Sequence, residues 1–271
     1  MDIMKGKIAL LSGLCILCFG IYGYQGKTEA NLNIVERVTD KADAKSIQNK
    51  PASVTKKQIK SKPAGTVLTT QEIKVIGKEK LFYSSKITDS VWKRIYKKSY
   101  KKDCVIPKND LRYIQILYYG FDKKSHVGEL IVNKKIEKDT IAVFKELYNK
   151  KYPIERVELI DNYNAEDEAS MTANNTSCFN YRTIKGKKTL SNHSKGLAID
   201  INPLYNPCVR TRNGVTVVEP SAGTVYANRK KQFSYKIDKN DFCYKTFKKY
   251  GFTWGGEWNS LKDYQHFEKT A

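Results

Sequence analysis

The sequence predicts an α+β fold, and three observations favour it. Residues 111–119 and 129–133 are rich in large apolar and aromatic residues and are bounded by Gly120 and Gly128, as β-strands commonly are. Residues 139–150 instead carry apolar side chains at helical spacing. Strands and helices do not alternate along the chain as they do in βαβ units, so a doubly wound parallel sheet is not expected.

The first 80 of the 271 residues are predicted to lie outside the folded domain. No Phe, Tyr or Trp occurs between Gln25 and Leu81, and a segment without aromatic residues buries little apolar surface. We therefore interpret residues 25–80 as a flexible, basic linker. Residues 81–271 form the predicted domain, which is long enough for a substantial hydrophobic core.

Residues 1–24 are predicted to be a membrane anchor or a signal segment. Lys5 and Lys7 precede an apolar run from Ile8 to Tyr24, which is long for the apolar region of a signal peptide and short for a membrane span. Cleavage of this segment is left open. Either interpretation places the domain outside the cytoplasm, membrane-anchored or secreted.

A first helix follows the two strands. Asp139 is expected to cap it, its end is expected near Lys150, and Pro153 lies beyond that end. One face of this helix carries the apolar residues Ile141, Phe144 and Leu147.

Further strand and helix signals lie towards the C-terminus. Val157 and Leu159 suggest another strand. A second helix is predicted over residues 240–250, and Gly251 is a typical stop signal for it.

The composition is strongly basic, with a formal net charge of +21. Residues 81–271 alone hold 35 Lys and Arg against 21 Asp and Glu, so the domain is basic in its own right. Such a field favours polyanions: nucleic acid, anionic lipid headgroups or the acidic polymers of a bacterial wall. A solvated, lysine-rich surface explains the charge equally well. Export makes wall polymers the expected polyanion, and we expect no nucleic-acid partner.

Cysteine usage leaves the disulfide state open. Cys15 and Cys18 fall within the N-terminal apolar run. The predicted domain holds an even number of cysteines, namely Cys104, Cys178, Cys208 and Cys243. In an oxidising compartment these permit one or two disulfides, and otherwise they are expected to be buried thiols.

Two short segments combine histidines with carboxylates. From Gly196 to Asn202 apolar and other residues alternate, which predicts a half-buried strand with Asp200 on its polar face. Gly196 lets the preceding loop turn, so that His193 converges with Asp200.

The second segment, near the C-terminus, carries Asp263 three residues before His266. This spacing lets His266 bind a metal while Asp263, in the same turn, reaches a bound water, and His266 begins a short strand expected to pair near the first. Two imidazoles and one carboxylate suit a catalytic zinc with an open position, and a spare carboxylate suits a general base. Glu257 and Glu268 are rival candidates for that base.

The order of these motifs resembles a known family. Ser191-x-His193 and Asp200 are followed by Trp-Gly-Gly-acid-Trp at 254–258 and by Asp-x-x-His-Phe at 263–267. Together with residues 128–133, 174–177 and 179–182, they resemble the VanY-like zinc D-alanyl-D-alanine carboxypeptidases and L-alanyl-D-glutamate endopeptidases over roughly residues 85–270. The resemblance implies the hedgehog/DD-peptidase fold, a small antiparallel sheet with flanking helices around a zinc cleft.

Carried over by position, the resemblance also implies roles for individual residues. The implied ligands of one zinc ion are His193, Asp200 and His266. Asp263 corresponds to the catalytic acid and base, and Arg182 to an arginine that helps to hold the substrate's carbonyl or carboxylate. Ser191 is expected to orient the site through hydrogen bonds, and Trp258 to form a wall of the substrate pocket.

These features together predict a metallopeptidase of the bacterial cell envelope. Its expected substrates are peptidoglycan stem peptides, cut at D-Ala–D-Ala or at L-Ala–D-Glu. Anionic wall polymers are further expected partners, and membrane contact is expected only through the N-terminal segment. One alternative is a non-catalytic, zinc-containing module that binds the cell wall; another is a basic adhesin for wall polymers. Asp263 favours the enzyme, because a module without catalysis has little need of a base beside its ligands.

Overall fold

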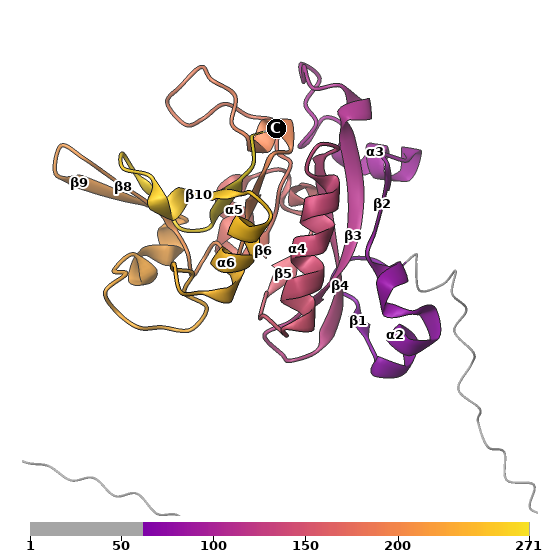
Figure 1. The fold of residues 1–271 in the computed structure, drawn as a ribbon. Helices are drawn as coiled ribbons and strands as arrows, with labels where there is room; N and C mark the ends of the chain where they lie inside the picture. Colours follow the sequence, from indigo (N-terminus) through magenta and orange to yellow (C-terminus); the bar gives the residue numbers. More distant parts are fainter. Residues whose placement is uncertain (1–61, 271) are drawn as a thin grey trace, which may run out of the picture. The chain divides into compact units, whose positions relative to one another are not determined.

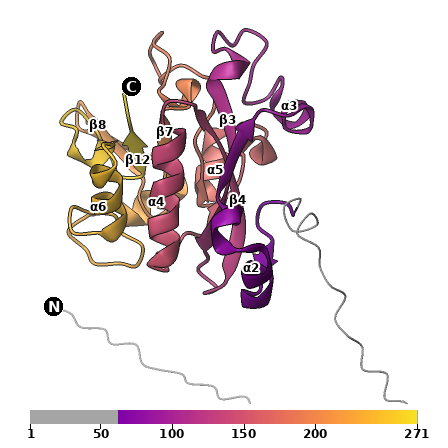
Figure 2. The ribbon, with the colours of Figure 1, turned by 45° about the vertical axis from the view of Figure 1, so that its right-hand side comes forward.

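The computed structural model describes residues 62–270, and these form an α+β fold (Figures 1 and 2). The predicted N-terminal anchor or signal segment and the predicted linker up to residue 61 lie outside the described residues. Within 62–270, no helix combines the length and the apolar character needed to cross a bilayer.

The largest sheet is antiparallel and has the strand order β1-β4-β3-β2. Its strands are β1 (Val67–Leu68), β2 (Tyr83–Lys86), β3 (Leu111–Tyr119) and β4 (Ser125–Asn133). The bounds of β3 are those predicted. β4 begins before residue 129, and Gly128 lies inside it rather than at its edge. A Cβ at Gly128 would lie 2.8 Å from Val157 Cβ, so the glycine permits close packing on that face.

Helix α4 (Glu137–Asn149) lies along this sheet, between it and α6 (Phe242–Lys249), as Figures 1 and 2 show. The predicted helix is therefore present, but it begins at Glu137 and Asp139 does not cap it. Asp139 instead accepts a hydrogen bond of 2.7 Å from Lys269 Nζ. Apolar burial sets the helix: Val143, Phe144 and Leu147 are almost fully buried in the main core.

The predicted linker boundary at residue 80 is wrong. Helix α2 (Thr70–Ile76) and a 3-10 turn (Lys78–Leu81) precede Leu81, and β1 pairs with β4. Leu68 and Ile76 are buried in the same core as the sheet. The segment lacks aromatic residues, but its aliphatic side chains suffice to anchor it.

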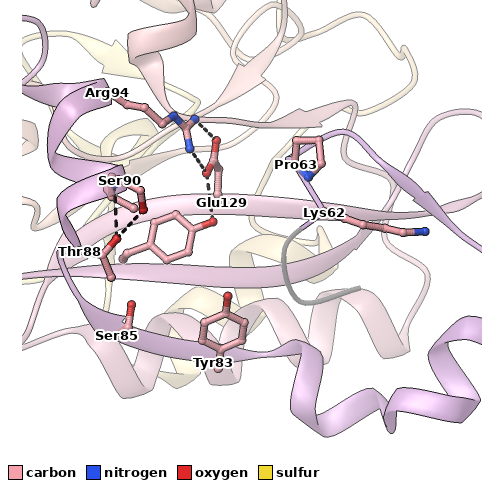
Figure 3. A pocket seen from close by; sticks show the side chains of 10 residues that line it. Lys62, Pro63, Tyr83, Ser85, Thr88, Ser90, Arg94 and Glu129 are labelled. Atoms are coloured by element: carbon pink, nitrogen blue, oxygen red, sulfur yellow. Dashed lines mark hydrogen bonds and ion pairs between the residues drawn. The ribbon is translucent and has the colours of Figure 1, made fainter. Parts of the chain in front are cut away.

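A second, smaller cluster covers the other face of the sheet. Helix α3 (Asp89–Ile95) packs Val91 and Ile95 there, together with Leu111 and Ile131. Beside it is a cavity of about 350 Å³ in which Arg94 and Glu129 point toward each other (Figure 3). The two side chains share hydrogen bonds of 2.8 and 2.5 Å. The charged groups of Arg94 and Glu129 therefore satisfy each other.

The C-terminal half adds small sheets. One is antiparallel with the order β10-β12-β7 and consists of β7 (Ala198–Asp200), β10 (Thr253–Trp254) and β12 (His266–Glu268). Another is antiparallel with the order β11-β8-β9 and consists of β8 (Cys208–Arg212), β9 (Val215–Glu219) and β11 (Lys262–Asp263). β5 (Arg156–Val157) pairs in parallel with β6 (Asn175–Thr176), and α5 (Asp167–Thr172) lies between them in sequence.

The remaining predicted elements are largely present. The second helix is α6, capped by Asp241, whose carboxylate accepts from Cys243 N at 2.8 Å. Gly251 follows it with φ of +80°. Val157 lies in β5, but Leu159 lies outside it and precedes a 3-10 turn (Ile160–Tyr163).

The four cysteines within residues 62–270 are free thiols. Three of them, Cys178, Cys208 and Cys243, are buried, and Cys104 is partly exposed. The alternative of buried thiols, left open by the sequence, therefore describes this structure.

Candidate metal centre

Strand pairing brings two of the predicted ligands together. β7 and β12 are antiparallel neighbours, and Asp200 stands directly opposite His266 in their register. The predicted short strand beginning at His266 is thus present and pairs with the predicted strand around Asp200.

The third predicted ligand enters from a short turn before β7. His193 begins a 3-10 turn (His193–Lys195) that ends at Gly196, where φ is +67°. Gly196 O accepts a hydrogen bond of 2.7 Å from Asn133 N at the end of β4. The turn is therefore fixed against the large sheet, and His193 is directed back toward Asp200, as the glycine predicted.

One ligand atom from each of the three residues lies within 4.8 Å of the other two. His193 Nε2 lies 3.2 Å from Asp200 Oδ2, His266 Nδ1 lies 3.2 Å from Asp200 Oδ1, and the two imidazole nitrogens are 3.2 Å apart. Zinc binds such atoms at about 2.0–2.1 Å in a tetrahedron, which implies ligand–ligand distances of about 3.3 Å. The donor set therefore fits one zinc ion, and all three residues are buried.

The outer nitrogens of both imidazoles fix their tautomers. His193 Nδ1 lies 2.7 Å from the carbonyl oxygen of Cys178, and His266 Nε2 lies 2.9 Å from Glu268 Oε2. Both partners only accept hydrogen bonds, so these nitrogens carry the protons, and the lone pairs of the inner nitrogens face Asp200. Two lone pairs and a carboxylate in one buried space require a cation.

Without a metal, a proton serves as that cation. Burial opposes a charge on His266, but its hydrogen bonds to Asp200 and Glu268 outweigh burial and raise the pKa of His266 to about 10. The hydrogen bond from His266 likewise lowers the pKa of Glu268. Asn192 Nδ2 donates to Glu268 Oε2 at 2.7 Å, so Glu268 is itself held in place.

Asp263 lies on a separate strand from His266, not in a shared turn as its spacing suggested. It belongs to β11 and is paired with Cys208 of β8. Gly255 makes its position possible, because a Cβ there would lie 2.6 Å from Asp263 O. The glycines of the Trp-Gly-Gly-acid-Trp motif thus allow close packing beside the site.

Among the three candidate bases, Asp263 has the least engaged carboxylate. Its Oδ1 is buried without a hydrogen-bond partner in the described part of the chain. Burial is the main cause that raises the pKa of Asp263 to about 6, and Asp200 adds to it. Glu257, by contrast, accepts from Tyr244 Oη at 2.8 Å and from Lys248 Nζ at 3.2 Å, and Glu268 is engaged by His266.

All the predicted site residues line one cavity of about 660 Å³. Arg182 forms an ion pair with Asp167 there. Ser191 Oγ accepts from His193 N at 3.2 Å, so it orients the turn that carries the ligand. The ring of Trp258 lies 5.1 Å from the ring of His266. The cavity thus brings together the three candidate metal ligands, the candidate base Asp263 and these three residues.

Two contributions were missed from the sequence. Glu268 was weighed only as a base, although alternation along a strand places residues two apart on the same face and so puts Glu268 beside His266. The Cys178 carbonyl carried no sequence signal, because it acts through the backbone. Both hold an imidazole rather than the ion.

Residues 185–269 match the family model Peptidase_M15_4, described as D-alanyl-D-alanine carboxypeptidase. The predicted family resemblance is confirmed over these residues. The match includes His193, Asp200, Asp263 and His266, whereas Arg182 lies just before it. No curated protein and no solved structure matches the chain significantly. A cluster suited to a divalent ion thus lies inside a segment shared with a peptidase family.

Proposed function

We propose that this chain is an exported zinc metallopeptidase that removes the terminal D-Ala from peptidoglycan stem peptides. One observation carries the proposal: the two imidazole nitrogens lie 3.2 Å apart and each lies 3.2 Å from an oxygen of Asp200, and Asp263, whose buried Oδ1 has no partner in the described chain, lines the same cavity. The family match supports a peptidase that acts on D-Ala-D-Ala. We further propose that the site is a hedgehog/DD-peptidase-like cleft and that the protein lies in the bacterial envelope. Its basic surface is proposed to attract anionic wall polymers.

The chemistry is divided among named groups. Zinc held by His193, Asp200 and His266 would lower the pKa of water and polarise the substrate carbonyl. Asp263 takes a proton from the attacking water and delivers it to the leaving amine. Arg182, on the cavity wall, donates hydrogen bonds to the substrate's carbonyl or carboxylate.

The supporting hydrogen bonds matter because they fix the site before substrate arrives. Glu268 and the Cys178 carbonyl hold the imidazole protons on the outer nitrogens. Ser191 holds the backbone of His193. A site fixed in this way needs little rearrangement during the reaction, which is the main way that preorganised groups accelerate it.

Digestion of purified peptidoglycan by the full chain, with and without a chelator, tests the proposal. Mass spectrometry should show the loss of one D-Ala, abolished by the chelator and restored by zinc. Release of peptides that begin at D-Glu would instead show L-Ala–D-Glu cleavage. Absence of any metal-dependent product, with wall binding retained, would favour the non-catalytic binding module.

A matched pair of variants tests the base. Asp263→Asn keeps the size of the side chain but cannot accept the proton, so turnover should fall at least ~100-fold, a typical contribution of general base catalysis, with zinc still bound. Glu257→Gln, an equivalent change in an acid that does not line the cavity, should retain activity. Comparable activity in the two variants would remove Asp263 from this role.

A further inference from the structure

One arginine in the metal cavity has no partner. Arg210, on β8, is half-buried and lines the cavity that holds the metal ligands. No hydrogen bond or ion pair links it to another residue of the described chain, whereas Arg182 is paired with Asp167 and Lys185 with Glu219. A guanidinium carries five donors and is costly to shield from water without an acceptor. Its position leaves these donors free for an anionic ligand.

Strand geometry places Arg210 near the proposed reaction. Cys208 is paired with Asp263, and both line the cavity. Arg210 is two residues further along β8 and so lies on the same face as Cys208, about 6.6 Å away along the strand. An arginine side chain spans a similar distance, so its guanidinium is long enough to extend across the cavity toward Asp263.

We propose that Arg210 binds the α-carboxylate of the residue that follows the scissile bond. This inference rests on the proposed function. One residue spans at most about 3.6 Å, so that carboxylate must lie inside the same cavity when the scissile carbonyl is at the metal. Guanidinium and carboxylate match in a bidentate pair. Both a terminal D-Ala and a D-Glu linked through its side chain present such a carboxylate.

The test compares substrates that differ only in this group. The kcat and KM of the zinc-loaded full chain are measured with an N-acylated L-Lys-D-Ala-D-Ala and with its C-terminal amide. A second pair, L-Ala-γ-D-Glu peptides with a free or amidated α-carboxylate, distinguishes the two sources. Wild type should prefer the free acid of one pair about 10- to 100-fold, since hydrogen bonds to charged groups are strong.

Arg210→Gln should remove that preference by raising KM for the acid, while the values for the amide change little. Arg156→Gln is the matched control, because Arg156 is exposed and does not line the cavity. Zinc content is measured in each variant. If Arg210→Gln lowers the turnover of the acid and of the amide by the same factor, or changes neither, Arg210 does not bind this carboxylate.

Failure of the proposed function is distinguishable from failure of this inference. If the wild type hydrolyses neither pair of peptides, the proposed function fails. Equilibrium binding of the same peptides then tests whether Arg210 binds the α-carboxylate. A tenfold or greater preference for the acid that disappears in Arg210→Gln would still support the assignment. Equal binding of acid and amide by the wild type would overturn it.

Discussion

Gly196→Ala should disturb the fold and the metal centre together. The residue has φ of +67°, and an added Cβ would lie 2.7 Å from Asn133 N and 3.0 Å from Val132 C. Left-handed backbone costs an alanine about 1–2 kcal/mol. The contacts are with backbone that is fixed in β4, so overpacking adds about 1–3 kcal/mol. The expected loss in free energy of unfolding is therefore about 2–5 kcal/mol.

Gly214→Ala separates the two causes. Gly214 has φ of +73°, but nothing lies within 4 Å of an added Cβ, so only the backbone cost of about 1–2 kcal/mol applies. Urea denaturation of both variants gives the difference. Zinc affinity, measured by competition with a chelator, should fall only for Gly196→Ala, because that change displaces the turn of His193. Equal losses of stability in the two variants would refute the steric reasoning.

Three further predictions concern charged groups. Arg94→Ala removes the cation from the carboxylate of Glu129, which is 3% exposed, whereas Arg94 is 41% exposed. We expect urea denaturation to show a loss of about 1–3 kcal/mol in the free energy of unfolding, smaller than for a fully buried pair. Adding Glu129→Gln should recover part of this loss. Glu268→Gln should weaken zinc binding about 10- to 100-fold, measured by chelator competition. The hydrogen bond from Lys62 is the main cause that lowers the pKa of Glu72 from 4.5 to about 2. The ionised Glu72 therefore stabilises the fold fully above pH 4.5, and this contribution is lost as the pH falls through 2. The difference in stability between wild type and Glu72→Gln should close over that range.

The sequence predicted the elements whose signals are local. β3 has the predicted bounds, because its apolar run ends where Gly120 turns the chain. The convergence of His193 with Asp200 followed from strand alternation and one glycine. The pairing of β7 with β12 followed from the need of two ligand-bearing segments to meet at one ion.

The predictions that failed depended on tertiary contacts. Asp139 resembles a cap, yet Lys269, from the last residues of the described chain, engages it. The start of the domain was placed too late, since the burial of Leu68 and Ile76 depends on where β1 pairs. The strand position of Asp263 was hidden for the same reason, because the pairing of β11 with β8 joins residues more than fifty positions apart.

The negative charge at the candidate metal site is accompanied by basic residues on the wall of its cavity. Asp200, Asp263 and Glu268 surround the ion position with three carboxylates, more negative charge than one divalent ion neutralises. A substrate that ends in a carboxylate would be repelled by the remainder. The same cavity is lined by five cations, of which Arg182 and Lys185 are paired with Asp167 and Glu219, whereas Lys187, Lys195 and Arg210 are available to offset this charge. In the proposed function the net charge of +21 would attract anionic wall material at a distance and be screened by salt, whereas Arg210 would act at contact. Raising the ionic strength should therefore slow the capture of whole peptidoglycan more than the hydrolysis of a short peptide, because only the first depends on the distant field.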